Sequence, residues 1–401
     1  MNYNEIYTAS LSLKEKLVKH RRTIHSFAET GFGTSKTAEY IKNVLTSLDI
    51  ETHNVCENGV IGFVKANESD KAFLVRSDID ALPVKEDTGL SFASRNGCMH
   101  ACGHDMHAAM LLGCAELLCK YKNQFSGKAA LLFQPAEETL EGASKVIQNG
   151  FDCKEYDGAM TLHVISPSDK ETGNVVLPKG GADAPSADFF KVTIKGKGCH
   201  GSSPWLGTDP ISCACNVIAS LDMLKAREVS AYLPFTLTVA SINSGTGFNV
   251  MPEKAEFCGS FRTFDEKVRE YVKNRIQQIC NGICEAYKCE YSVEYKSGCP
   301  SLYIDKELVQ RFEKVLKNTI GESKVTVSDA DNTTELKGSE DFAYFSREIK
   351  SFTAAIPAGY KKDEKYSSQM HSPKVMFDED ALAVGCSVFT ACTLDFLKDG
   401  Q

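Results

Sequence analysis

The sequence has no long uninterrupted run of apolar residues and no extended cluster of basic residues. Residues 1–19 are polar and do not resemble a signal peptide, and no later run approaches the roughly 18 apolar residues of a membrane span. We therefore expect a cytoplasmic protein with no membrane partner. Because the formal net charge is −8 and groups of lysine and arginine are short, we also expect no nucleic-acid partner.

Internal repeats, low-complexity tracts and flexible linkers are also missing from the sequence. Hydrophobic residues make up 42% of the chain and charged residues 24%, which is ordinary usage for a globular protein and excludes disordered and fibrous classes. Because 401 residues are more than one hydrophobic core usually organises, we expect two domains.

Disulfide bonds are not expected, although the chain has 16 cysteines. In the cytosol thiols stay reduced, so most of these side chains are predicted to be small buried apolar groups, as the helical patterns around Cys213, Cys280 and Cys284 indicate. A thiol redox centre would need a Cys-x-x-Cys pair, and Cys98 and Cys102 are one residue too far apart.

Residues 97–109 combine three of the nine histidines with two cysteines. In an extended chain the side chains of Cys102 and His104 would point to one side, as two ligands of one metal ion require. A helical pattern starts near Asp105, which would be its N-cap or an acid in its first turn. We interpret the segment as the start of a metal site. The alternatives are ordinary polar residues at a helix entrance, or a compact structural zinc site formed by Cys98, Cys102, His104 and His107.

The first part of the sequence alternates short apolar strands with helices. The predicted strands span 59–65, 72–76, 129–134 and 158–163. The predicted helices span 11–28, 37–48, about 105–118 and 143–148. This alternation predicts an α/β fold in which a mostly parallel sheet is flanked by helices. In such a sheet, reactive groups collect just past the carboxyl ends of the strands.

Acidic residues and a histidine stand where three of these strands end. Asp78 and Asp80 follow one strand, Glu137 and Glu138 follow another, and His163 ends a third. We expect these residues to form one site. One glutamate could bind metal while the other moves protons. A divalent ion lowers the pKa of its bound water toward about 7. A free carboxylate can then take the proton from that water and later deliver it to a leaving amine.

The middle of the sequence has a different pattern of elements. A strand, a helix, two strands, a helix and a strand are predicted in turn at 188–195, 212–224, 235–242, 255–262, 267–286 and 289–295. This order is typical of a four-stranded antiparallel sheet with two helices on one side. We therefore predict an inserted α+β, ferredoxin-like domain over 184–298, between the two parts of a metal-binding catalytic domain over 1–183 and 299–401.

Seven short motifs follow one another along the chain. They are Arg76-Ser-Asp-Ile-Asp-Ala-Leu-Pro, Met99-His-Ala-Cys-Gly-His-Asp-Met-His, Phe133-Gln-Pro-Ala-Glu-Glu, Leu162-His163, Asn249-Val-Met-Pro, Gly338-Ser-Glu-Asp-Phe and Met370-His371. Jointly they resemble the aminoacylase and carboxypeptidase G family of metallopeptidases, over about residues 21–385. Within that family they resemble the amidohydrolase branch of hippurate hydrolases, N-acyl-amino-acid amidohydrolases and plant indole-acetyl-amino-acid hydrolases. Each motif alone is unspecific, whereas the joint pattern is specific.

The resemblance implies a zinc-peptidase-like catalytic domain that holds two divalent metal ions, of zinc, manganese, cobalt or nickel. Carried over position by position, the metal ligands would be Cys102, His104, Glu138, His163 and His371. Glu137 would be the general base. Residues that orient the ligands from outside the metal's own shell would be Asp80, Asp105 and Glu340.

The resemblance also assigns residues of the inserted domain, which would serve as a lid and join two chains in a homodimer. His200 would reach the scissile carbonyl oxygen, and Asn249 and Arg262 would bind the substrate. A guanidinium group suits the substrate carboxylate because it forms two parallel hydrogen bonds to it. Two positions depart from the family pattern: Ser-Phe-Ala-Glu follows His25 where Asn-Pro-Glu is usual, and Pro204 is followed by Trp205 in place of histidine.

The expected activity is metal-dependent hydrolysis of the amide bond between an acyl group and an amino acid, a small-molecule substrate. One alternative is a dipeptidase or small carboxypeptidase, but a dipeptidase would need a group that holds a free α-amine, and the sequence identifies none. The other is a binding protein that has kept the fold without catalysis. The intact Glu137 and the complete set of metal ligands argue against that alternative.

Overall fold

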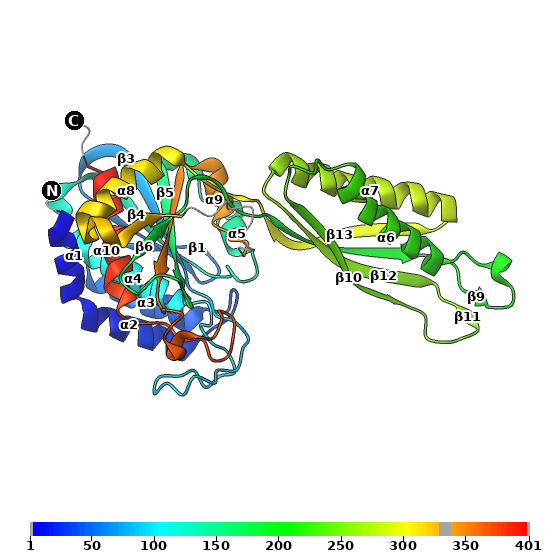
Figure 1. The fold of residues 1–401 in the computed structure, drawn as a ribbon, viewed down its shortest axis with the longest axis horizontal. Coiled ribbons are helices and arrows are strands. Elements are labelled where there is room, and N and C mark those ends of the chain that lie inside the picture. Colours follow the sequence, from blue (N-terminus) through cyan, green and yellow to red (C-terminus); the bar gives the residue numbers. More distant parts are fainter. Residues whose placement is uncertain (1–2, 329–337, 399–401) are drawn as a thin grey trace. The chain divides into compact units, whose positions relative to one another are not determined.

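The computed structural model describes residues 3–328 and 338–398 (Figure 1). Within these limits the chain divides into two compact units. The first comprises residues 3–181, 303–328 and 341–398, and the second comprises residues 182–302 and 338–340. No helix in the described ranges is long and apolar enough to cross a membrane.

The first unit contains a mixed eight-stranded sheet, in the order β1-β2-β4-β3-β5-β16-β6-β15. Its strands are β1 (Thr52–Cys56), β2 (Gly59–Lys65), β3 (Asn67–Asp78), β4 (Ser126–Gln134), β5 (Gly158–Ile165), β6 (Val175–Leu177), β15 (Val325–Val327) and β16 (Ser351–Pro357). The central strands β4, β3, β5 and β16 are parallel, whereas β2 runs antiparallel to both β1 and β4, and β6 antiparallel to β16. The predicted α/β fold with a mostly parallel sheet is confirmed, and the antiparallel edge is an addition to it.

Eight helices of the described chain belong to the first unit (Figure 1). They are α1 (Tyr3–Ser12), α2 (Lys14–Phe27), α3 (Ser35–Ser47), α4 (His104–Lys120), α5 (Gly142–Gln148), α8 (Lys306–Ile320), α9 (Ala343–Glu348) and α10 (Ala381–Phe396). Helices α4 and α10 are buried along almost their whole length. They pack against each other at small residues, since a side chain on Gly385 would overlap with Met110.

The second unit is built on an antiparallel sheet of four strands in the order β10-β12-β8-β13. Its elements are β8 (Ala187–Lys195), α6 (Pro210–Arg227), β10 (Phe235–Ser244), β12 (Lys254–Thr263), α7 (Glu266–Tyr287) and β13 (Glu290–Cys299). Alternate residues of β8, such as Phe190, Val192 and Ile194, pack with apolar residues of α6 and α7 in one core. One sheet face is thus covered by both helices, which confirms the predicted ferredoxin-like domain (Figure 1).

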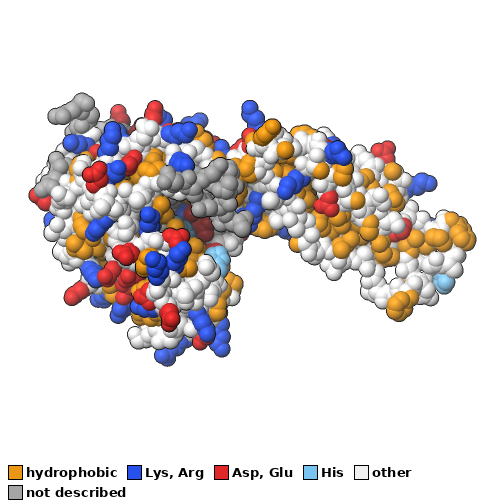
Figure 2. Space-filling view, in the orientation of Figure 1, with side chains coloured by type: hydrophobic (Ala, Val, Ile, Leu, Met, Phe, Trp, Pro, Cys, Tyr) orange, Lys and Arg blue, Asp and Glu red, His pale blue; other side chains and the backbone are white. Residues whose placement is uncertain are grey.

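Two short strand pairs complete the fold. Strand β7 (Gly181–Ala184) pairs with β14 (Leu302–Ile304), and β9 (Cys199–His200) pairs with β11 (Val250–Met251). Around the β9–β11 pair, large apolar side chains remain exposed on the second unit (Figure 2), among them Trp205, Leu206, Phe248 and Val250. Phe248 is fully exposed and Trp205 is 76% exposed, so this end of the unit is unusually apolar for a protein surface.

Candidate metal centre

Cys102 and His104 come together through a tight turn, and the predicted extended chain at this point is wrong. Gly103 between them has a φ of +83°, in the left-handed region, and α4 begins directly at His104. A side chain on Gly103 would also overlap with Val164. Only glycine satisfies both requirements, because it has no Cβ. Asp105 lies in the first turn of α4, and Gly103 takes the N-cap position.

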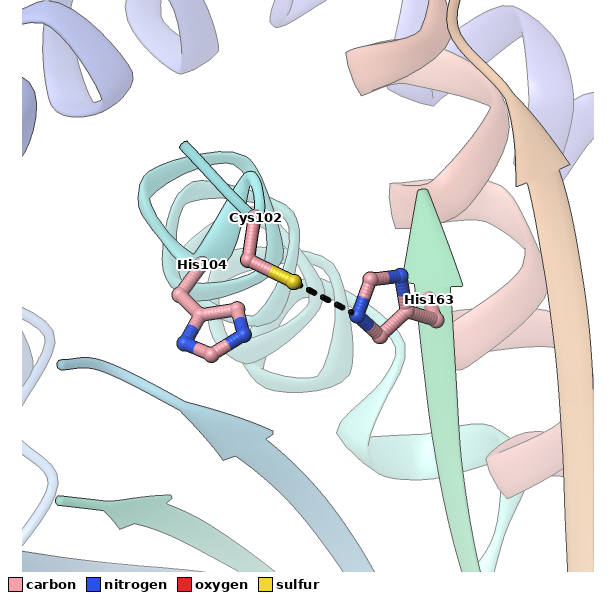
Figure 3. Close-up of side chains that lie close together, drawn as sticks. All are labelled: Cys102, His104 and His163. Atoms are coloured by element: carbon pink, nitrogen blue, oxygen red, sulfur yellow. Dashed lines mark hydrogen bonds between the residues drawn. The ribbon is translucent and has the colours of Figure 1, made fainter. Parts of the chain in front are cut away.

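The predicted metal ligands of the first unit form three overlapping groups, in each of which all ligand atoms lie within 4.8 Å of one another. These groups are Cys102 with His104 and His163, Cys102 with Glu138 and His371, and His104 with Glu137 and Glu138. The Cys102 sulfur is 3.4 Å from Nε2 of His163 at the end of β5 (Figure 3). The Glu138 carboxylate is 3.8 Å from Nε2 of His104 and 3.7 Å from Nε2 of His371.

The donor atoms of this cluster fit a divalent cation. Nε2 of His104 and Oε1 of Glu138 are buried and have no hydrogen-bond partner among the described residues, which is costly unless something else binds them. Burial raises the pKa of Glu138 and of the Cys102 thiol. A divalent cation would satisfy the orphaned atoms and stabilise both side chains as anions. Sulfur, imidazole nitrogen and carboxylate oxygen are all donors that zinc accepts.

Backbone carbonyls hold the Nδ1 atoms of His104, which is buried, and of His163, which is partly buried. Nδ1 of His104 lies 2.9 Å from the carbonyl oxygen of Asp80, and Nδ1 of His163 lies 2.6 Å from that of Val164. A hydrogen on Nδ1 leaves the lone pair on Nε2, the atom that faces the cluster. Burial lowers the pKa of His163 to about 3, so this imidazole stays neutral, as a metal ligand must be.

Asp80 connects the end of β3 to both segments that carry ligands. Its carboxylate accepts hydrogen bonds from the backbone N–H groups of Glu137, at 3.0 Å, and of Glu138, at 3.2 Å. Its carbonyl oxygen orients His104, as described above. This placement agrees with the orienting role that the sequence resemblance implies for Asp80.

Asp78, which was expected at this site, forms a buried pair with His107, which was predicted only as a ligand of the alternative structural zinc site. Nδ1 of His107 lies 2.6 Å from Oδ1 of Asp78, and Nε2 of His107 accepts the backbone N–H of Val164 at 2.8 Å. Both ring nitrogens are therefore engaged. A compact structural zinc site that includes Cys98 and His107 finds no support among the described residues, because Cys98 joins none of the ligand groups.

A second unpredicted feature is the fully buried ion pair between Arg76 and Asp341. Arg76 donates to Asp341 at 2.7 Å and to Asp78 at 2.8 Å. Asp341 also accepts from the side chain of Gln134 and the backbone N–H of Ala143, each at 2.8 Å. Its neighbour Glu340 was predicted at the site from the sequence, whereas Asp341 was not. An arginine inside an apolar strand was the available signal, because a buried guanidinium requires an acidic partner.

Asp105 is held from α2. Its carboxylate accepts hydrogen bonds from Nε of Arg21, at 3.1 Å, and from Nδ1 of His25, at 2.9 Å. Burial alone would raise the pKa of Asp105, but the charges of Arg21 and His25 hold it well below its usual value. Asp105 is therefore ionised and fixed in place directly after the predicted ligand His104.

His200 lies on β9 of the second unit, and Asn249 directly precedes β11. His200 is opposite Val250 in the strand pairing, and its Nδ1 accepts the backbone N–H of Ser202 at 3.2 Å. The backbone N–H of Gly201 donates to the carbonyl oxygen of Asn249 at 2.7 Å. The two predicted substrate-contacting residues are thus brought next to each other.

Arg262 and Glu340 also belong to the second unit. Arg262 is half-buried on β12, and its Nη1 donates to the hydroxyl of Ser339 at 2.7 Å. One edge of its guanidinium is therefore already fixed by a neutral partner. Glu340 follows Ser339 and is half-buried.

Comparison with known proteins agrees with this arrangement. Residues 74–395 match the model of peptidase family M20/M25/M40. The chain is 35% identical over 373 residues to an N-acetyl-L-cysteine deacetylase of Bacillus subtilis, covering 92% of this chain and 86% of the relative. It is 31% identical over 392 residues to a hippurate hydrolase of Campylobacter jejuni, covering 97% and 98%.

Solved structures give the same result. A protein of methicillin-resistant Staphylococcus aureus matches with a TM-score of 0.90 and 32% identity, over 99% of this chain and 100% of that one. A dinuclear metal-binding M20 peptidase of Bacillus subtilis matches with a TM-score of 0.77 and 28% identity, over 96% and 99%. The chain therefore belongs to the M20/M25/M40 peptidase family and, within it, to the amidohydrolase branch of these metal-binding hydrolases.

Proposed function

We propose that this hydrolase cleaves the amide bond of N-acyl-L-amino acids, including aroyl and indole-acetyl conjugates. The observation that carries the proposal is the convergence of three ligand groups around two orphaned buried atoms, Nε2 of His104 and Oε1 of Glu138, with Glu137 beside them. Relatives of about 30% identity or more are named for N-acetylcysteine, hippurate and IAA-amino acid substrates, and these names support the substrate class.

In this proposal two divalent ions are held by Cys102, His104, Glu138, His163 and His371. When bound, such ions acidify a water molecule and polarise the amide carbonyl group. The donor set mixes sulfur, nitrogen and oxygen, so it accepts zinc, manganese, cobalt or nickel, and the native metal depends on availability.

Glu137 would take the proton from the attacking water and pass it to the leaving amine. Its carboxylate is buried and lies 3.9 Å from Nε2 of His104, so it borders the ligand cluster. Glu138 shares ligand groups with three other predicted ligands, Cys102, His104 and His371, whereas Glu137 shares one only with His104 among these three, which favours Glu138 as the ligand and Glu137 as the base. A carboxylate at the edge of a metal cluster is well placed for general-base catalysis.

The second unit would contribute the substrate contacts. Arg262 would bind the substrate carboxylate, His200 would stabilise charge on the carbonyl oxygen, and Asn249 would hold the amide. An N-acyl amino acid and its carboxamide should then differ in kcat/KM by about 2–5 kcal/mol of transition-state binding. Equal kcat/KM for acid and amide would remove Arg262 from the site.

We further propose that two chains form a homodimer through the second unit. The exposed apolar side chains around β9 and β11 would be covered in such a dimer (Figure 2), and a symmetric dimer is the commonest assembly. His200 would then act on the metal centre of the partner subunit.

A cytoplasmic location is supported by the 16 cysteines, all of which are free thiols.

A substrate screen tests the proposed activity. The metal-loaded protein is incubated with N-acetyl, N-benzoyl and indole-acetyl amino acids, and the released amino acid is quantified. Unblocked dipeptides and N-blocked dipeptides form a second arm, because a relative of 31% identity is named a thermostable carboxypeptidase. Release from the N-acyl amino acids supports the proposal, whereas release only from the peptide arm would identify a peptidase.

A further inference from the structure

Arg21 and His25 form a buried pair on one face of α2, four residues apart and therefore one helical turn from each other. Both bind Asp105 in the first turn of α4, as described above. His25 also bridges to Glu86, with 3.1 Å between Nε2 and the carboxylate. Arg21 donates in addition to the carbonyl oxygen of Phe377 at 3.3 Å. A helix without any predicted metal ligand thus contacts three separate segments near the metal centre.

His371 differs from the other predicted ligands in how it is held. Its side chain is 54% exposed, whereas the side chain of His104 is fully buried and that of Glu138 is 11% exposed. Its φ is +66°, in the left-handed region that residues other than glycine rarely adopt. Such a conformation persists only when surrounding contacts enforce it. Because more than half of the side chain is exposed, contacts of the backbone are the main constraint on this conformation.

The backbone around His371 is held at three points. The N–H of His371 donates to the carbonyl oxygen of Ala101 at 2.9 Å, and the carbonyl oxygen of Pro373 accepts from the N–H of Asp87 at 2.8 Å. The carbonyl oxygen of Phe377 accepts from Arg21. The last of these bonds comes from α2 directly. The bond between Asp87 and Pro373 depends on α2 indirectly, because His25 of α2 binds Glu86, the residue before Asp87.

Glu86 also fixes the fold of its own loop. It accepts the backbone N–H of Ser94 at 2.7 Å, and the loop is closed by the backbone pair between Leu82 and Met99. His25 thus ties this loop to α2 through Glu86. We propose that Arg21 and His25 are positioning residues that set the place of His371, and with it the affinity of the metal ion that His371 binds. This inference rests on the ligand set of the proposed function.

The test compares metal retention in four proteins. They are the wild type, His25→Ala, Glu86→Gln and the control His20→Ala. His20 is on the same helix and similarly buried, but its Nδ1 pairs with the hydroxyl of Tyr40, away from the ligand segments. Each protein is loaded with Zn²⁺ or Mn²⁺ and dialysed against a graded series of chelator concentrations. Metal content per chain and the melting temperature of the metal-free protein are then measured.

The wild type and His20→Ala should release their two ions over the same chelator range. His25→Ala and Glu86→Gln should lose one ion per chain at about 10–100-fold lower chelator concentration, the usual effect of removing a group that orients a ligand. Excess metal should restore their kcat for an N-acyl amino acid while the half-saturating metal concentration stays raised. A purely structural role would lower the melting temperature without this selective loss.

Two further outcomes are decisive. If the wild type holds two ions and the two variants release both ions over the wild-type range, the positioning role is wrong while the metal site stands. If the wild type itself binds no stoichiometric metal, the proposed function fails first, and the inference fails with it. Glu86→Gln keeps the result readable if His25→Ala does not fold, because glutamine preserves the volume and one acceptor oxygen.

Discussion

Several buried side chains in this protein are charged, and neighbouring polar and charged groups stabilise these charges. His25 is the clearest example. Burial lowers the pKa of His25, and the nearby charge of Arg21 lowers it further. The charge of Asp105 and the hydrogen bonds to Asp105 and Glu86 outweigh both effects and raise the pKa from 6.5 to about 9. The raised pKa stabilises the folded state below pH 6.5, and this contribution, on the order of 3 kcal/mol, is lost as pH rises through 9.

Urea unfolding of the metal-free protein at pH 6 and pH 9.5 measures this contribution. The wild type should exceed His25→Gln in free energy of unfolding at pH 6, and the difference should shrink at pH 9.5, where His25 is neutral in both the folded and the unfolded state. His20→Gln is the control: burial lowers the pKa of His20 to about 4, so its imidazole is neutral in the folded protein at both pH values and should not give the wild type an advantage that is larger at pH 6 than at pH 9.5. A difference that is independent of pH would show that His25 is not charged in the folded protein.

At the scale of single residues, site residues in short motifs could be predicted from the sequence. Pairs of residues that lie far apart in the sequence could not. The five metal ligands were named from short motifs, and all five lie in the ligand groups, although their role as ligands stays a prediction. Arg76 and Asp341 are 265 positions apart, so no local pattern joins them. His25 was given no role at the site from the sequence, since its partners, Glu86 and Asp105, are 61 and 80 positions away and no local pattern joins them.

Among the elements, the turn into α4 controls whether the ligands can converge. Gly103 and Gly97 have similar φ values, +83° and +88°, but a side chain on Gly103 would overlap with Val164, whereas Gly97 has open space around it. Alanine at either position costs about 1–2 kcal/mol for the left-handed backbone. Only Gly103→Ala should add a packing penalty, of about 1–3 kcal/mol, and displace Cys102 from His104.

The free energy of unfolding and the zinc content of Gly103→Ala and Gly97→Ala check this prediction. Gly103→Ala should be the less stable of the two and should bind less zinc, while Gly97→Ala keeps its full metal content. Equal losses in both variants would mean that backbone strain alone matters and that the contact with Val164 has no role.

Strands and amphipathic helices were predictable because their burial repeats with a fixed period. Strand β2 spans the predicted range 59–65, and α3 lies within two residues of its predicted limits at both ends. The predicted single helix over 11–28 is divided into α1 and α2 at Leu13. Strand β1 was not predicted, since its sequence is mostly polar and its pairing with β2 depends on tertiary contacts.

At the scale of the whole molecule, the proposed dimer would divide each active site between two chains. His200→Ala and Glu137→Ala should each be nearly inactive alone, because removal of one oxyanion-stabilising donor costs about 3–4 kcal/mol and removal of the base lowers kcat by about 10²–10⁴-fold. When the two variants are co-expressed, each mixed dimer should rebuild one complete site. Statistical assortment should then restore about a quarter of the wild-type activity.

Purified heterodimers carrying two different affinity tags make this measurement quantitative. A monomer in solution, or verified heterodimers without recovered activity, would mean that His200 acts within its own chain or not at all. Heterodimers of Glu137→Ala with Glu137→Gln are the matched control, because they contain no complete site in either arrangement.

The proposed chemistry depends most on the division of roles between the neighbours Glu137 and Glu138. Metal content and turnover of Glu137→Gln and Glu138→Ala, measured on the same preparations, test it directly. Glu137→Gln should keep both metal ions and lose at least about 10²–10⁴-fold in kcat, the range that general-base catalysis contributes. Glu138→Ala should lose one metal ion per chain. A metal-free Glu137→Gln protein together with a metal-replete Glu138→Ala protein would contradict the assignment.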